Sequence, residues 1–176
     1  MENKYILNDK FGINGIEKVS FTEIINTFSY PDSIEISKDR GSNNLTVSFY
    51  YDSGNLEIVY FINYYLKSKI VEMYNLMFVV KKLYLNDKEY IKNRQDIRKV
   101  LTKIRKYFKK KNKKFEFEYE EHMFGGSYIF EDPSMTLYFD KEDDKKYLDD
   151  IYVGLPYEDY PEVLSVGELL DLVKPY

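Results

Sequence analysis

The chain has 176 residues, no cysteine and a formal net charge of −4 at pH 7. Without cysteine it has no disulfide, no thiolate nucleophile and no cysteine metal site, as is usual in a reducing compartment. No apolar run reaches the roughly 18 residues that a membrane helix needs, and the N-terminus lacks the apolar core of a signal peptide. These features predict a cytoplasmic protein folded as one domain, 1–176, with sub-units 1–88 and 89–176 as the alternative division.

The first half of the chain predicts one short helix followed by strands. A capping-box spacing at Ser20 and Glu23 predicts a helix at about 20–29. Apolar and polar residues alternate in 45–51, and a Gly-containing turn separates this stretch from 56–65, which is typical of an antiparallel hairpin. Further strands are predicted at 33–37 and 76–84.

The clearest helical pattern follows at 93–111. Its apolar residues recur at helical spacing and form one stripe: Ile97, Val100, Leu101, Ile104 and Phe108. Basic residues occupy much of the remaining surface, and Asn112 is the predicted exit. Lys103 to Lys114 holds eight basic residues in twelve positions. This stretch is interpreted as a solvated helix face. The alternative function is a nucleic-acid-associated regulator that binds phosphates through the basic helix 93–114.

Strand patterns rich in carboxylates occupy Phe115 to Val153. Phe115, Phe117 and Tyr119 alternate with glutamates, which predicts a strand with one aromatic and one acidic face. Further strands are predicted at 135–140 and 147–153, with a turn at Gly125-Gly126-Ser127 and a charged loop at 140–146. A second capping box, Ser165 and Glu168, predicts a final short helix. The order predicts an α+β fold with helices on an antiparallel sheet, compatible with two helix-plus-meander units.

Motifs for catalysis or cofactor binding are missing. There is no GxGxxG, no GxxxxGK[ST] and no GxSxG sequence. Glu120 and His122 would point to one side of a strand, as two legs of a metal or acid–base site, but the sequence offers no third ligand. The stretch 140–151 departs from the calcium-binding EF-hand loop at two required positions, Lys145 and Ile151. We therefore predict a non-enzymatic protein with no catalytic residue, metal or cofactor.

Charge is divided between the two parts of the chain. Residues 1–115 hold 22 Lys and Arg against 13 Asp and Glu, whereas residues 116–176 hold 4 against 17. The two parts could neutralise each other within the fold, or the acidic part could meet a basic protein partner. The candidate partner-binding residues are Glu116, Glu118, Tyr138, Asp140, Glu142, Asp143, Asp144, Asp149, Asp150, Tyr152, Tyr157, Glu158, Asp159 and Tyr160.

In its small size, acidity, aromatic content and lack of cysteine and catalytic motifs, the chain resembles the immunity proteins of bacterial polymorphic-toxin and contact-dependent inhibition systems. The repeated helix-then-meander order also resembles the tandem repeats of β-lactamase-inhibitor-like folds. Immunity proteins bind a cognate toxin, often a basic nuclease, and neutralise it through acidic surfaces. The resemblance implies occlusion of a basic toxin domain. It rests on no diagnostic motif and assigns no residue.

Overall fold

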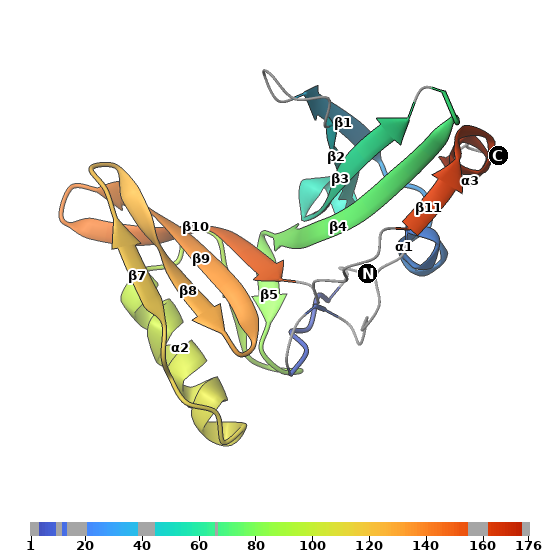
Figure 1. The fold of residues 1–176 in the computed structure, drawn as a ribbon. Coiled ribbons are helices and arrows are strands. Elements are labelled where there is room, and N and C mark those ends of the chain that lie inside the picture. The colour runs from blue at the N-terminus through green and yellow to red at the C-terminus, as the bar shows by residue number, and fades with distance from the viewer. Residues whose placement is uncertain are drawn as a thin grey trace. The chain divides into compact units, whose positions relative to one another are not determined.

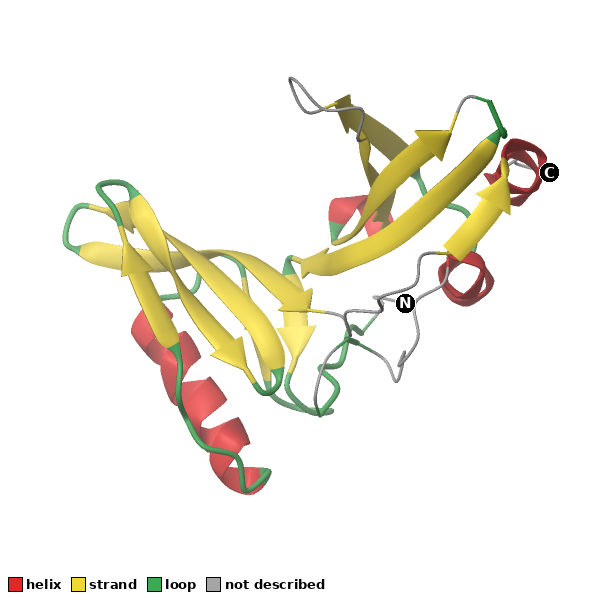
Figure 2. Ribbon diagram, viewed as in Figure 1, coloured by secondary structure: helices red, strands yellow, loops and turns green. Residues whose placement is uncertain are grey.

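The computed structural model describes residues 4–9, 12–13, 21–38, 45–65, 67–154 and 162–173. In these ranges the chain is mostly antiparallel sheet with three short helices, so the predicted α+β class is confirmed (Figure 1, Figure 2). The helices are α1 (Phe21–Phe28), α2 (Ile97–Lys110) and α3 (Val166–Val173). No helix in the described ranges combines the length and apolar character needed to cross a bilayer.

The chain divides into two compact units, which we name after their helices. The α2 unit comprises Met1–Ile16 and Phe78–Gly154, and the α1 unit comprises Glu17–Met77 and Leu155–Tyr176. Each unit contains a helix followed by an antiparallel meander. The boundaries differ from a single cut at residue 88, because the C-terminal strand returns to pair with a strand from the first half of the chain.

The α1 unit confirms the predicted strands at 33–37, 45–51 and 56–65, whereas the predicted 76–84 strand is divided between β4 and β5, which are separated at Lys81. Its strands pair in the order β1-β2-β3-β4, with β11 on β4. They are β1 (Ser33–Lys38), β2 (Leu45–Tyr51), β3 (Leu56–Tyr65), the greater part of β4 (Ile70–Val80) and β11 (Glu162–Ser165). The second capping box is confirmed, since the Glu168 N–H donates to Ser165 Oγ at 3.2 Å and the Ser165 N–H donates to Glu168 Oε2 at 2.8 Å. Ser20 of the first box lies outside the described residues.

The α2 unit holds the acidic part of the chain. A short pair of strands, β5 and β6, stands apart from a meander of order β10-β9-β8-β7. The strands are β5 (Lys82–Tyr84), β6 (Tyr90–Lys92), β7 (Glu118–Glu121), β8 (Gly125–Glu131), β9 (Ser134–Glu142) and β10 (Lys145–Gly154). Sequence analysis did not predict β5 and β6 as a separate pair.

Helix α2 packs on one face of the β7–β10 meander, which we call the inner face (Figure 1). The ring centroids of Phe108 and Phe130 lie 5.4 Å apart, and Phe108 is 1% exposed. The inner-face side chains of β9 and β10 are buried: Met135, Leu137, Phe139, Leu148, Ile151 and Val153. Burial of this apolar area stabilises the unit and decides which alternate residues of each strand turn outward.

Helix α2 begins later than the predicted residue 93, because the preceding residues pair with β10. The Arg94 N–H donates to the Leu148 carbonyl at 2.7 Å, and the Leu148 N–H donates to the Gln95 carbonyl at 2.8 Å. Asp96 then caps the helix, and its side chain accepts from the N–H groups of Arg98 and Lys99. The predicted exit is confirmed: Asn112 has φ of 54°, and the Lys113 N–H donates back to the Phe108 carbonyl at 2.9 Å.

Two loops predicted in the acidic region are wrong. Gly125 and Gly126 begin strand β8 and form no turn. Glycine is required at 126 because a Cβ there would collide with the Glu120 carbonyl of the neighbouring strand. The 140–146 segment is strand at both ends, and the turn is confined to Asp143 and Asp144. The predicted 115–120 strand starts only at Glu118.

The cap at Asp96 generates a stability prediction. We expect Asp96→Ala to lower the free energy of unfolding by about 1 kcal/mol, because two N–H groups at the start of α2 lose their acceptor. Asp96→Asn keeps a side-chain oxygen and should cost less. Denaturant titration of both variants measures the difference, and equal losses in the two would contradict a capping role.

Candidate functional site

The face of the β7–β10 meander opposite α2, which we call the outer face, gathers acidic residues from separate strands. The pairing register places Glu118 beside Ile129 and Glu120 beside Ser127. It then places Ser127 beside Tyr138 and Gly125 beside Asp140. Paired residues of antiparallel strands project to the same side. Glu118, Glu120, Tyr138 and Asp140 therefore share this face, and Tyr138 is 41% exposed.

Four carboxylates of the outer face have no partner in the described part of the chain. The side chains of Glu118, Glu120, Glu131 and Asp140 form no hydrogen bond or ion pair there. Glu118, Glu120 and Glu131 are exposed, whereas Asp140 is half-buried. Glu120 and Glu131 were not among the predicted binding residues. The alternation of strands β7 and β8 was the signal that could have identified them.

An acidic groove of about 500 Å³ opens at the N-terminal end of β7. It forms because residues 113–117 form no strand, so that the β8 residues after Ile129 have no ladder partner in β7. Phe117 and Ile129 supply apolar lining. The carboxylates that line the groove are Glu116, Glu118, Glu131 and Asp132. Asp132 pairs with Lys113 and Glu116 lies 3.8 Å from Lys114 Nζ, which leaves Glu118 and Glu131 unpaired.

Other predicted binding residues are neutralised within the α2 unit. Glu142 pairs with Arg94 at 2.6 Å, and Asp150 pairs with Lys81. Part of the charge division is therefore compensated inside the fold, by bases from the first part of the chain. Asp143 and Asp144 are exposed in the β9–β10 turn without partners in the described ranges.

Asp149 lies where β10 departs from regular pairing. The register with β9 shifts between Leu148 and Ile151, and Asn93 Nδ2 donates to the Asp149 carbonyl at 2.5 Å. Burial, and then the charges of Asp150 and Asp140, raise the pKa of Asp149. Because the charged form is disfavoured in the folded protein, ionised Asp149 lowers stability near neutral pH. Asp149 therefore takes part in the bulge through its backbone carbonyl, and its carboxylate belongs to the predicted acidic set.

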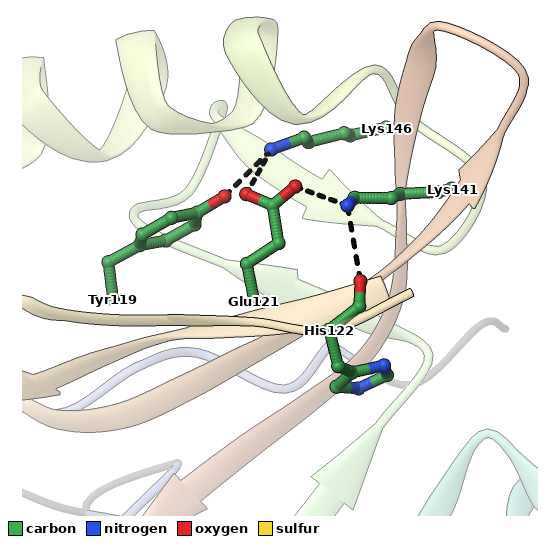
Figure 3. Close-up of polar contacts among 5 residues, drawn as sticks. All are labelled: Tyr119, Glu121, His122, Lys141 and Lys146. Atoms are coloured by element: carbon green, nitrogen blue, oxygen red, sulfur yellow. Dashed lines mark hydrogen bonds and ion pairs between the residues drawn. The ribbon is translucent and has the colours of Figure 1, made fainter. Parts of the chain in front are cut away.

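Glu121 has the opposite role from its neighbour Glu120, because it points to the inner side of β7. Figure 3 shows its carboxylate between Lys141, with which it pairs, and Lys146 Nζ at 2.9 Å. Lys146 also donates to the Tyr119 hydroxyl at 2.7 Å. The hydrogen bonds from Lys141 and then Lys146 lower the pKa of Glu121. Its pairing therefore stabilises the fold at neutral pH, and this contribution is lost as the pH falls through that lowered pKa.

His122 does not join a carboxylate site in the structure. Its carbonyl accepts from Lys141 Nζ at 3.1 Å, and its ring points away from the two lysines (Figure 3). In the ranges that the structure describes, no group of three or more His, Asp or Glu side chains is placed to hold a metal.

The remaining predicted residues are two tyrosines of the sheet and four residues of the tail. The rings of Tyr138 and Tyr152 lie 4.7 Å apart. Four predicted residues lie outside the described residues: Tyr157, Glu158, Asp159 and Tyr160.

Comparison of the chain with protein-family models, curated proteins and solved structures finds no match.

The raised pKa of Asp149 generates a pH-dependent prediction. We expect Asp149→Asn to raise Tm at pH 7, because it removes a disfavoured charge and keeps the side-chain oxygen near Asn93. The gain should shrink as the pH falls and the wild-type carboxyl becomes protonated. Thermal unfolding at pH 7 and pH 3 measures it. Asp150→Asn, which removes the pairing with Lys81, is the control and should give no gain. A Tm gain for Asp149→Asn that is unchanged at pH 3 would refute the charge explanation.

Proposed function

We propose that this protein is a non-enzymatic binding protein that neutralises a basic protein, in the manner of an immunity protein that occludes its toxin. The observation that carries the proposal is the outer face of the α2 unit. Unpaired carboxylates from strands β7, β8 and β9 lie there around an exposed tyrosine.

Unpaired like charges on one face disfavour the folded state by mutual repulsion. The basic residues of α2 do not relieve this repulsion, because the buried stripe of the helix packs on the inner face and no base of α2 forms an ion pair with these carboxylates in the described ranges. A partner that brings cations to the outer face would relieve it. Such complementarity speeds association and selects the partner.

Tyr138 and Tyr152 support contact with a protein partner. Their rings lie against each other on the same sheet face as the carboxylates. Tyrosine provides a large apolar surface with a polar hydroxyl and is enriched among residues that dominate binding energy. A partner surface with basic side chains around an apolar centre would match this arrangement.

The proposal is tested by capture from extracts of the cells that make this chain, followed by kinetics with the purified partner. We expect a basic partner whose association slows about tenfold for Glu118→Lys or Glu120→Lys, because each reverses an unpaired charge of the face. For an immunity protein, co-expression with the partner should restore growth, and the same variants should restore it less.

Asp87→Lys is the matched control, because it makes the same change of charge at an exposed residue of the β5–β6 loop. It should alter association less than about threefold. An acidic partner, or equal slowing by Asp87→Lys and Glu120→Lys, would contradict the proposal.

A second candidate function rests on α2. Exposed bases of this helix have no ion-pair partner in the described ranges, and the helix holds no acidic residue: the bases are Arg98, Lys99, Arg105, Lys106, Lys109 and Lys110. This stripe favours a nucleic-acid-associated regulator. Mobility-shift titration with duplex and single-stranded DNA at low salt should then show binding that Lys106→Glu weakens. Absence of any shift at low ionic strength would eliminate this alternative.

A further inference from the structure

We propose that strand β7 receives an added strand from the basic partner, whose segment is extended and alternates basic with apolar side chains. This inference rests on the proposed function and names how the partner binds. β7 ends the hydrogen-bonded order of its meander, and all four of its residues are exposed.

The backbone of β7 is open toward its outer edge. The His122 N–H donates to the Gly125 carbonyl at 2.9 Å, and residues of an antiparallel pair alternate in the direction of their hydrogen bonds. Glu118 and Glu120 therefore bond to β8, whereas the N–H and C=O groups of Tyr119 and Glu121 turn to the open edge. The N–H and C=O groups of Tyr119 and Glu121 form no hydrogen bond with another described residue. They can bond an incoming strand, as in other cases of strand addition.

The two faces of β7 define the partner's side chains. Glu118 and Glu120 lie on the outer face, and the groove beside Glu118 adds the unpaired carboxylate of Glu131. On the inner face, Phe117 is 39% and Tyr119 is 43% exposed at the edge. Directly opposed residues of antiparallel strands lie within about 5.5 Å. The added strand would therefore carry lysine or arginine on its outer side and apolar residues beside Tyr119.

The charge of β7 also disfavours a second copy of this chain as the source of the added strand. Pairing of β7 with another β7 would bring the outer-face glutamates of both strands together, and like charges across a strand pair are destabilising. Charged side chains protect sheet edges against self-association in this way. The same carboxylates that oppose a second β7 favour a strand with cations at alternate positions.

The test uses a synthetic ten-residue peptide of alternating lysine and valine, titrated against the whole protein at low salt by calorimetry. In the proposed pairing, valine lies opposite Tyr119 and its N–H bonds to β7, whereas the lysine N–H groups point away. We expect N-methylation of the valines to weaken binding at least tenfold. N-methylation of the lysines should change it less than about threefold, since those N–H groups make no bond to β7.

Protein variants provide a second measurement. Tyr119→Pro removes an outward N–H, a change that edge strands tolerate, whereas Tyr119→Thr removes the ring and keeps the N–H. Binding of the parent peptide should be at least tenfold weaker for Tyr119→Pro than for Tyr119→Thr.

The outcomes separate the inference from the proposed function. Equal affinities for both N-methylated peptides, combined with loss of binding in Glu120→Lys, would overturn strand addition and leave the acidic face as the binding surface. Strand addition would also be overturned if the parent peptide showed no binding at a concentration of about 1 mM, which corresponds to a very weak dissociation constant. Slowing of the captured partner by Glu120→Lys would then still support the proposed function.

Discussion

The packing of α2 on the inner face of the β7–β10 meander is the interaction on which the rest of the α2 unit depends. Phe108 meets Phe130, and the buried residues of β9 and β10 lie on the same side. Strand side chains alternate with period two, so covering one face assigns every other residue to the opposite face. The face on which each carboxylate of β7, β8 and β9 lies follows from this apolar contact.

The adjacent glutamates of β7 show the consequence most directly. Glu120 turns outward and has no partner among the described residues, whereas Glu121 turns inward and joins β7 to lysines of β9 and β10. The aromatic side chains follow the same division, since the rings of Tyr119 and Tyr128 lie 4.9 Å apart on the inner side. Two chemically identical neighbours therefore stabilise the fold in one case and remain available for a partner in the other.

The pairing of charges also separates structural from available carboxylates. Glu142 and Asp150 are compensated by bases that precede α2, and Asp149 is held in the bulge of β10. These residues help to join the segment before the helix to the sheet. The carboxylates that stay unpaired in this unit include those of the β9–β10 turn and those of the outer face and the edge of β7, and only the latter lie together around Tyr138, which is why a binding role is proposed for that part of the surface.

Local chemistry was sufficient to predict much of the fold. The 45–51 and 56–65 hairpin, the apolar stripe of α2, its exit at Asn112 and the capping box at Ser165 all depend on neighbouring residues in sequence. The acidic set was predicted only as a composition. Which carboxylates are neutralised depends on Lys81 and Arg94, far away in the chain, and the start of α2 depends on pairing with Leu148. The sequence by itself determined the alternation of aromatic and acidic residues in 115–120. Only the tertiary structure decided that β7 is an open edge, because strand order and ion pairs arise from contacts between distant segments.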